Sequence, residues 1–80
     1  MQEHLQQART FVVDLAISAD EFLRLYQGSA RAVVVRARNG QTVQFPANAL
    51  TRFVLHDGVH GSFRLVIDAR NRLESIDRIG

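Results

Sequence analysis

The sequence contains no cysteine and no lysine. The absence of cysteine excludes disulfide bonds and thiolate metal sites. The absence of lysine means that all ten cationic side chains are arginines, which are scattered among eight acidic residues. Arginine suits the recognition of phosphates, but nucleic-acid-binding proteins usually cluster their arginines. Coding bias in a GC-rich genome is therefore the favoured explanation for this usage, and a functional role is the alternative.

Long apolar runs are also absent, and none approaches the roughly 20 residues of a membrane-spanning helix. The first ten residues are polar and include Glu3, unlike a signal peptide. We therefore expect a cytoplasmic protein that does not enter a membrane. Its 80 residues correspond to one domain, and we expect residues 1–9 to be a flexible leader before a single domain at residues 10–80. Without disulfides, so small a domain needs efficient packing or a partner subunit.

The domain is predicted to begin with a strand and a helix. Apolar side chains recur at every second position from Phe11 to Ile17, which predicts a strand with one buried face. Ser18 and Glu21 have the spacing of a capping box, and Gly28 suits the left-handed position that follows many helices. The pattern predicts a helix over residues 19–27.

The dipeptide Asn39-Gly40 lies between two apolar runs and is typical of a two-residue type I′ hairpin turn. Such a turn would place Val34 opposite Phe45, with both side chains facing the core. On the other face of the sheet it would place Val33, Val35 and Ala37.

The stretch from Phe45 to Phe63 contains the only proline of the chain. Pro46 lacks an amide donor and is expected to end a strand or lie on an edge. A short helix capped by Asn48, a glycine-containing loop and a strand over residues 62–68 would follow. Residues 72–79 have two interpretations: their three-residue apolar spacing indicates a helix, whereas the turn-forming residues before them indicate a strand. We favour the strand, with or without a bulge.

These elements predict an α+β fold. The expected architecture is a twisted antiparallel sheet of four to five strands, in the order β-α-β-β-β-β, packed on one short helix. The sheet would be either open or curled toward a small barrel. The predicted core consists of Phe11, Val13, Leu15, Phe22, Tyr26, Val34, Val43, Phe45, Leu50, Phe53, Phe63, Leu65 and Ile67.

The outward face of this sheet is more apolar than a solvated face would be. One short helix cannot cover both faces, and exposed apolar surface usually marks a contact. We therefore predict a small interaction module that self-associates through this face or a sheet edge. The expected partner is a second copy of the chain, in a homodimer, or else another protein. The alternative is that the valines are only good strand formers. The predicted interface residues are Val12, Val33, Val35, Ala37 and Val66.

Nucleic-acid binding is the alternative function. Arginines on the sheet surface would contact the phosphate backbone. The inward direction of the strand aromatics, however, leaves no exposed rings on which bases would stack. The predicted contacts are Arg31, Arg36, Arg38 and Arg64.

The sequence predicts no catalytic, cofactor-binding or metal-binding site. His56 and His60 are four residues apart, but Gly58 lies between them in a turn-forming segment, so their imidazoles are not expected to share a helix face. The serines lack a nucleophile-elbow motif, and the acidic residues lie singly beside arginines. The glycines form no phosphate-binding loop.

One further set of residues is informative as a group: Tyr26-Gln27-Gly28, Gly40, Phe45-Pro46-Ala47, Leu50, Phe53-Val54, Gly58-Val59, Gly61, Phe63 and Asp68. With this set, the chain resembles a family of small bacterial proteins known as domain-of-unknown-function family 2835. The resemblance covers most of residues 11–79. It implies a stand-alone cytoplasmic protein with no assigned activity, so no catalytic residue is carried over. It also supports a structural role for the glycines and the proline between Phe45 and Phe63.

Overall fold

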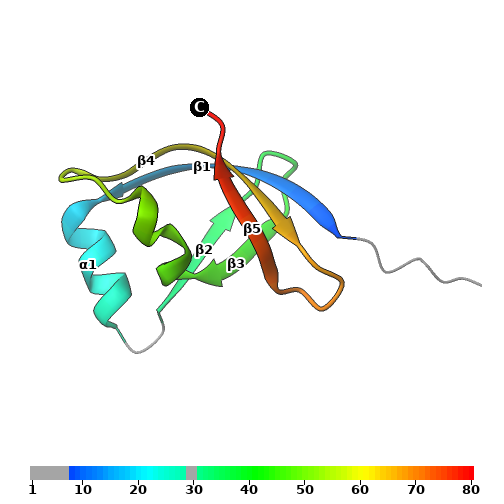
Figure 1. Cartoon of the computed structure of the whole chain (residues 1–80), viewed down its shortest axis with the longest axis horizontal. Helices are drawn as coiled ribbons and strands as arrows, with labels where there is room; N and C mark the ends of the chain where they lie inside the picture. The colour runs from blue at the N-terminus through cyan, green and yellow to red at the C-terminus, as the bar shows by residue number, and fades with distance from the viewer. Residues whose placement is uncertain (1–7, 29–30) are drawn as a thin grey trace, which may run out of the picture.

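A computed structural model describes residues 8–28 and 31–80. The elements in chain order are β1 (Arg9–Ser18), α1 (Ala19–Gln27), β2 (Ala32–Arg36), β3 (Thr42–Pro46), the 3-10 helix η1 (Ala47–Phe53), β4 (Gly58–Ile67) and β5 (Leu73–Arg78). The five antiparallel strands form two sheets, one of order β1-β4-β5 and one of β2-β3 (Figure 1). The predicted α+β class and element order are confirmed. The single sheet is wrong, and the two sheets do not close into a barrel.

Of the leader expected at residues 1–9, residues 1–7 lie outside the described residues, and Arg9 begins β1. Strands β1 and β4 each contain ten residues and pair along their whole length, from Arg9 opposite Ile67 to Ser18 opposite Gly58. Because side chains alternate across a strand, this register places Phe11 and Phe63 on the same face, where both are buried. Phe63 also packs edge to face with Phe53 of η1, with ring centroids 5.0 Å apart. The predicted inward direction of these aromatics is confirmed.

The start of α1 confirms the predicted capping box. The Ser18 hydroxyl accepts a hydrogen bond from the Glu21 amide, and the Glu21 carboxylate accepts one from the Ser18 amide, both at 3.1 Å. These two bonds pair amide groups that a helix N-terminus otherwise leaves without partners. The helix begins and ends at the predicted residues.

The other end of α1 corrects two predictions. Tyr26 stacks on the buried Phe22, with ring centroids 5.9 Å apart, but it is 45% exposed and does not belong to the core. Gly28 has a φ of −73°, so it is extended rather than left-handed. A β-carbon there would lie only 2.8 Å from the Arg24 carbonyl oxygen, so close packing rather than backbone conformation favours glycine.

The β2–β3 hairpin differs from its prediction by one residue. Its loop has three residues, 38–40, because Ala37 pairs with Gln41 and its amide donates to the Gln41 carbonyl at 2.7 Å. In this loop only Gly40 has a positive φ, of 91°, whereas a type I′ turn would also need one at Asn39. The Asn39 side chain instead accepts a hydrogen bond from the Gln41 amide at 3.0 Å.

A slip of one residue turns every side chain of a strand to the opposite face. Val34, which was predicted to lie in the core, is 63% exposed. Val33 and Ala37, which were predicted to lie on the outer face, are buried, and Val35 is half-buried against the core. The predicted interface residues therefore do not form one continuous surface.

The turn from β3 into η1 follows the prediction in part. Pro46 is the last residue of β3 and lies on the edge of its sheet, as expected. η1 has no side-chain cap, so the predicted capping role of Asn48 is wrong. Leu50 is fully buried, and this contact holds η1 against the core.

The loop predicted around His56 and His60 is shorter than expected. Leu55 and Gly58 exchange two backbone hydrogen bonds of 2.8 and 2.9 Å around a tight turn. His60 and Gly61 then belong to β4 rather than to a loop. Gly58 has a φ of 114°, and a β-carbon there would overlap the Ile17 carbonyl oxygen, so this position requires glycine.

The C-terminal segment is strand β5, and the helical alternative is wrong. It pairs with β4, with a bulge between Val66 and Ile67. The intervening turn is organised by Asp68, whose carboxylate accepts hydrogen bonds from the amides of Arg70 and Arg72, each at 2.9 Å. These bonds lower the pKa of Asp68, with the bond from the Arg72 amide as the main cause.

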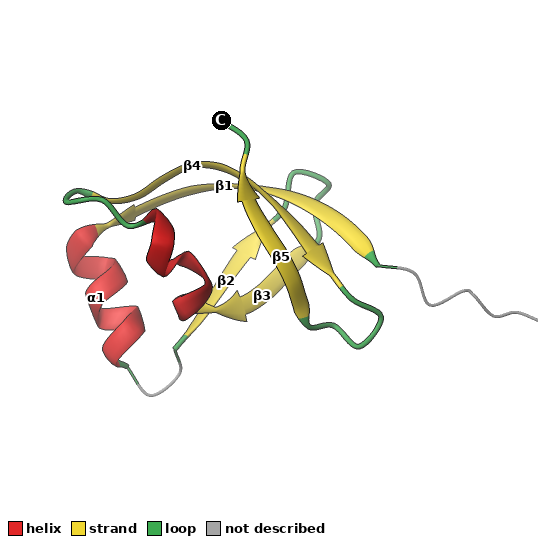
Figure 2. Ribbon diagram, in the orientation of Figure 1, coloured by secondary structure: helices red, strands yellow, loops and turns green. Residues whose placement is uncertain are grey.

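Figure 2 shows both helical segments at one end of the molecule, where β1 passes into α1. Beside α1, strands β1 and β2 border the same hollow. Neither helical segment in residues 8–28 and 31–80 is long and apolar enough to cross a membrane.

Candidate interaction groove

A groove of about 690 Å³ lies between β1, α1 and β2. In Figure 1, β1 runs along the top of this region, α1 lies at its left and β2 crosses below it diagonally. The hairpin loop after β2 meets β1 at the narrow end, where the Arg38 amide donates to the Val12 carbonyl at 2.8 Å. From this contact, β1 and β2 diverge toward α1. The larger apolar lining residues are Leu15, Ile17, Leu25, Val33, Val34 and Val35.

Strand β1 presents an unpaired backbone edge to this groove, since β4 is its only partner among the described strands. In an antiparallel pair, the amide and carbonyl groups of successive residues point alternately toward and away from the partner. The Val12 carbonyl points away from β4, because it accepts from Arg38. The backbone groups of Asp14 and Ala16 share this direction and therefore face the groove.

Strand β2 presents a second edge, since among the described strands it pairs only with β3. The bond between Ala37 and Gln41 fixes the alternation on this strand. Val33 and Val35 therefore bond to β3. The amide and carbonyl groups of Val34 point the other way, into the groove that this residue lines.

A polar cluster closes the narrow end. The Arg38 guanidinium donates two hydrogen bonds to the Asp14 carboxylate, at 2.9 and 2.7 Å, and a third to the Ser62 hydroxyl at 3.1 Å. The Ser62 hydroxyl in turn donates to Asp14 at 2.6 Å. Together these donors hold the pKa of Asp14 well below its usual range, with the Arg38 hydrogen bonds as the main cause. Asp14 likewise raises the pKa of Arg38. The cluster links β1, β4 and the hairpin loop.

The wide end carries three charged side chains. Glu21 accepts from the Ser18 amide, which is the main cause of its lowered pKa, and Arg24 adds a smaller lowering. Arg31 has a φ of 52°, a conformation that non-glycine residues rarely adopt. Its Nε donates to the Gly28 carbonyl at 3.1 Å. The side chains of Arg24 and Arg31 thus border the same groove.

The opposite edge of the three-stranded sheet is partly covered by η1. The Arg52 guanidinium of η1 donates a hydrogen bond to the Ile76 carbonyl on the outer side of β5. The same guanidinium lies 4.7 Å from the centre of the Phe53 ring, which holds it in place. The outer edge of β5 is therefore less available than the edges of β1 and β2.

Two of the predicted interface residues remain on the outer face of the three-stranded sheet. Val12 and Val66 are half-buried and lie on the paired strands β1 and β4. Val33 and Ala37 are buried and do not lie on an outer face, and Val33 and Val35 contribute only to the wall of the groove.

The two candidate histidines do not gather ligands around them. His60 Nδ1 lies 3.9 Å from the Asp57 carboxylate, a long separation between exposed groups. Across residues 8–28 and 31–80, no three histidine or acidic side chains lie close enough to hold a metal ion.

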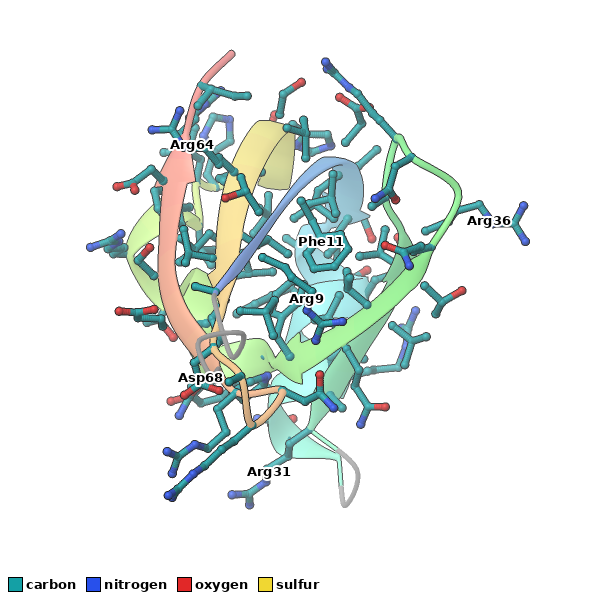
Figure 3. All side chains as sticks on the ribbon, turned by 90° about the vertical axis from the view of Figure 1, so that its right-hand side faces the viewer. Arg9, Phe11, Arg31, Arg36, Arg64 and Asp68 are labelled. Carbon is teal, nitrogen blue, oxygen red and sulfur yellow. The ribbon has the colours of Figure 1, made fainter. Side chains whose placement is uncertain are left out.

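The four arginines predicted to contact nucleic acid do not form one patch. Figure 3 shows Arg64, Arg36 and Arg31 on three different sides of the molecule. Arg38 is already engaged with Asp14. The structure therefore does not bring these four side chains together.

The whole of both sheets, both helical segments and the groove falls within one family match. The chain matches the family described as "Protein of unknown function (DUF2835)" over residues 9–79. The chain belongs to this family. No curated protein and no solved structure matches the chain. The resemblance stated from the sequence is thus confirmed, and the groove belongs to the DUF2835 part of the chain.

Sequence reasoning missed the groove, although two signals pointed toward it. Asp14 is an acidic residue at an outward position of an otherwise apolar strand, and Arg38 directly precedes the hairpin turn. An ion pair between them would have placed the hairpin against β1 in the DUF2835 fold. Nothing local to either segment identifies the other as its partner.

Proposed function

We propose that this DUF2835 protein is a small interaction module that binds an extended protein segment along the exposed edge of β2. The observation that supports this function is the groove bordered by two unpaired strand edges. An added strand would take main-chain hydrogen bonds from β2, which supply affinity. Its alternate side chains would meet the groove wall and supply specificity.

Strand β2 lacks the usual protection of an edge strand. Edges are commonly blocked by proline, a bulge, a central charge or a covering element. The five residues of β2 contain no proline, and their pairing with β3 is regular. The central residue is the exposed Val34 rather than a charged one. An open, apolar-centred edge of this kind favours strand addition.

The other functional expectations stand as follows. Self-association through a sheet edge is one form that this contact can take. Self-association through the predicted valine face has less support, because Val33 and Ala37 are buried. Nucleic-acid binding has less support, because the four arginines lie apart. A cytoplasmic location and the lack of catalytic activity stay predictions from the sequence.

The test uses two matched proline variants. Val34→Pro removes an amide that points into the groove, whereas Gln44→Pro removes the amide opposite it, which points to the outer side of β3. Neither amide contributes to the β2–β3 ladder, and proline is tolerated at such edge positions. Circular dichroism would first verify that both variants are folded.

A display library of random peptides would then be selected on the wild-type protein and on both variants. We expect enriched sequences to bind the wild-type protein and the Gln44→Pro variant, and to lose binding to the Val34→Pro variant. Equal binding to all three proteins, or the failure of any sequence to enrich, contradicts the proposed function.

A further inference from the structure

The charged side chains of the groove differ in the hydrogen bonds that they make. Its carboxylates already accept strong hydrogen bonds, Asp14 from Arg38 and Ser62, and Glu21 from the Ser18 amide. The arginines at the wide end are less occupied. Within the described part of the chain, the Arg24 side chain makes no hydrogen bond or ion pair, and the Arg31 side chain makes one hydrogen bond, through Nε. The groove thus offers guanidinium donors at one end, and both of its carboxylates already accept hydrogen bonds.

We propose that the segment bound in this groove is an extended peptide that carries an acidic side chain at the end beside α1. This inference rests on the proposed function, since the peptide is taken to add to the edge of β2. Arginine forks match carboxylates in geometry and charge, so Arg24 and Arg31 would receive the acidic residue.

The length of the site follows from β2. Five residues of strand span about 17 Å at roughly 3.3 Å per residue. A segment of this length would run from the contact between Arg38 and Val12 to the neighbourhood of Arg31. Its inward side chains would face Leu25 and Val35, which favours apolar residues at every second position.

The narrow end would not attract a second carboxylate, because the Arg38 guanidinium is already paired with Asp14. The inferred specificity is therefore directional, with the acidic residue at the α1 end only. A probe that carries an acidic residue at each end satisfies this requirement in either chain direction.

The experiment measures binding of defined fluorescent peptides by anisotropy. The main probe alternates valine and threonine over about eight residues, has blocked termini, and ends in glutamate on both sides. Matched probes carry glutamine or lysine in place of glutamate. We expect the glutamate probe to bind about tenfold more tightly than the glutamine probe at low salt, and this advantage to shrink as salt screens the charges.

Variants then locate the charge recognition. We expect Arg24→Gln and Arg31→Gln each to weaken the glutamate probe about threefold, and neither to change the affinity of the glutamine probe. Arg64→Gln, a change on another side of the molecule, should leave both affinities unchanged. A glutamate probe with N-methylated backbone should not bind, because it cannot form strand hydrogen bonds, and this control requires no change to the protein.

The outcomes separate this inference from the proposed function. If the three probes bind equally and Val34→Pro abolishes binding, the edge site is supported and the acidic preference is overturned. If no probe binds, or the N-methylated probe binds equally well, both ideas are overturned. If light scattering shows a dimer that Val34→Pro dissociates, a second copy occupies the edge and the acidic peptide is overturned as its occupant.

Discussion

The two edges of the three-stranded sheet differ in how they are covered. On the β5 side, Arg52 bonds to the Ile76 carbonyl, and η1 and β5 border a shared hollow that contains Glu74 and Asp77. On the β1 side, the hairpin touches only the narrow end, through Arg38 and Val12. Beyond that contact, the edges of β1 and β2 both face an open groove.

This difference supports the proposed contact at the open strand edge. Exposed strand edges favour unwanted pairing, and proteins commonly protect them. Here η1 covers part of the β5 edge through a charged side chain, whereas the hairpin meets the β1 edge only at one end. An unprotected edge beside an apolar groove is consistent with the proposed binding of an extended segment.

The largest expected loss of stability comes from replacing Gly58, which packs against the junction of β1 and α1. Gly58→Ala would force a β-carbon against the Ile17 carbonyl at the junction of β1 and α1, and its φ of 114° is unfavourable for alanine. We expect a loss of about 3 kcal/mol or more in the free energy of unfolding, measured with urea.

Gly40→Ala is the matched control, because Gly40 also has a positive φ but a β-carbon added there would meet no atom within 4 Å. We expect it to cost only about 1 kcal/mol. Equal losses in the two variants would show that the β1–α1 junction is less tightly packed than the structure indicates.

A smaller loss of stability is expected from removing the Arg52 contact with β5. Arg52→Gln removes the charged donor from the Ile76 carbonyl, and we expect a loss of about 1–2 kcal/mol in urea unfolding. Arg64→Gln, on the exposed face of β4, should change stability by less than about 0.5 kcal/mol. If the two variants are equally stable, Arg52 does not protect the β5 edge and the contrast between the edges fails.

The smallest effect concerns the exposed ion pair at the narrow end. The pKa of Asp14 is lowered in the folded state by Arg38 and Ser62. Its contribution is therefore present above the unfolded pKa, near 4, and is lost as the pH falls toward the folded value. We expect Asp14→Asn to lower the melting temperature slightly at neutral pH, and this difference to shrink as the pH is lowered from about 4 toward 2. A difference in melting temperature that stays constant with pH would show that the charge of Asp14 does not contribute to stability.

The sequence predicted the elements better than their mutual arrangement. The bounds of α1 followed from Ser18 and Glu21, because a capping box is a local pattern. The directions of Phe11 and Phe63 followed from alternation along their strands. Strand β5 followed from the turn residues before it, since Asp68 organises that turn with its own neighbours.

The register of β2 could not be predicted from the local sequence, because contacts with residues far away in the chain help to decide it. Asn39-Gly40 suits both a two-residue loop and a three-residue loop. Arg38 bonds through its amide to Val12 and through its side chain to Asp14, and both contacts require the hairpin to lie against β1. The buried positions of Val33 and Ala37, and with them the groove, depend on this tertiary contact.

The most direct test of the open β2 edge is amide hydrogen exchange measured by NMR on the isolated protein. The amides of Val33 and Val35 bond to β3 and should exchange slowly, whereas the amide of Val34 faces the groove and should exchange at least about tenfold faster. A protected Val34 amide between two fast neighbours would contradict the account, because it would mean that β2 pairs in the other register and presents no such edge.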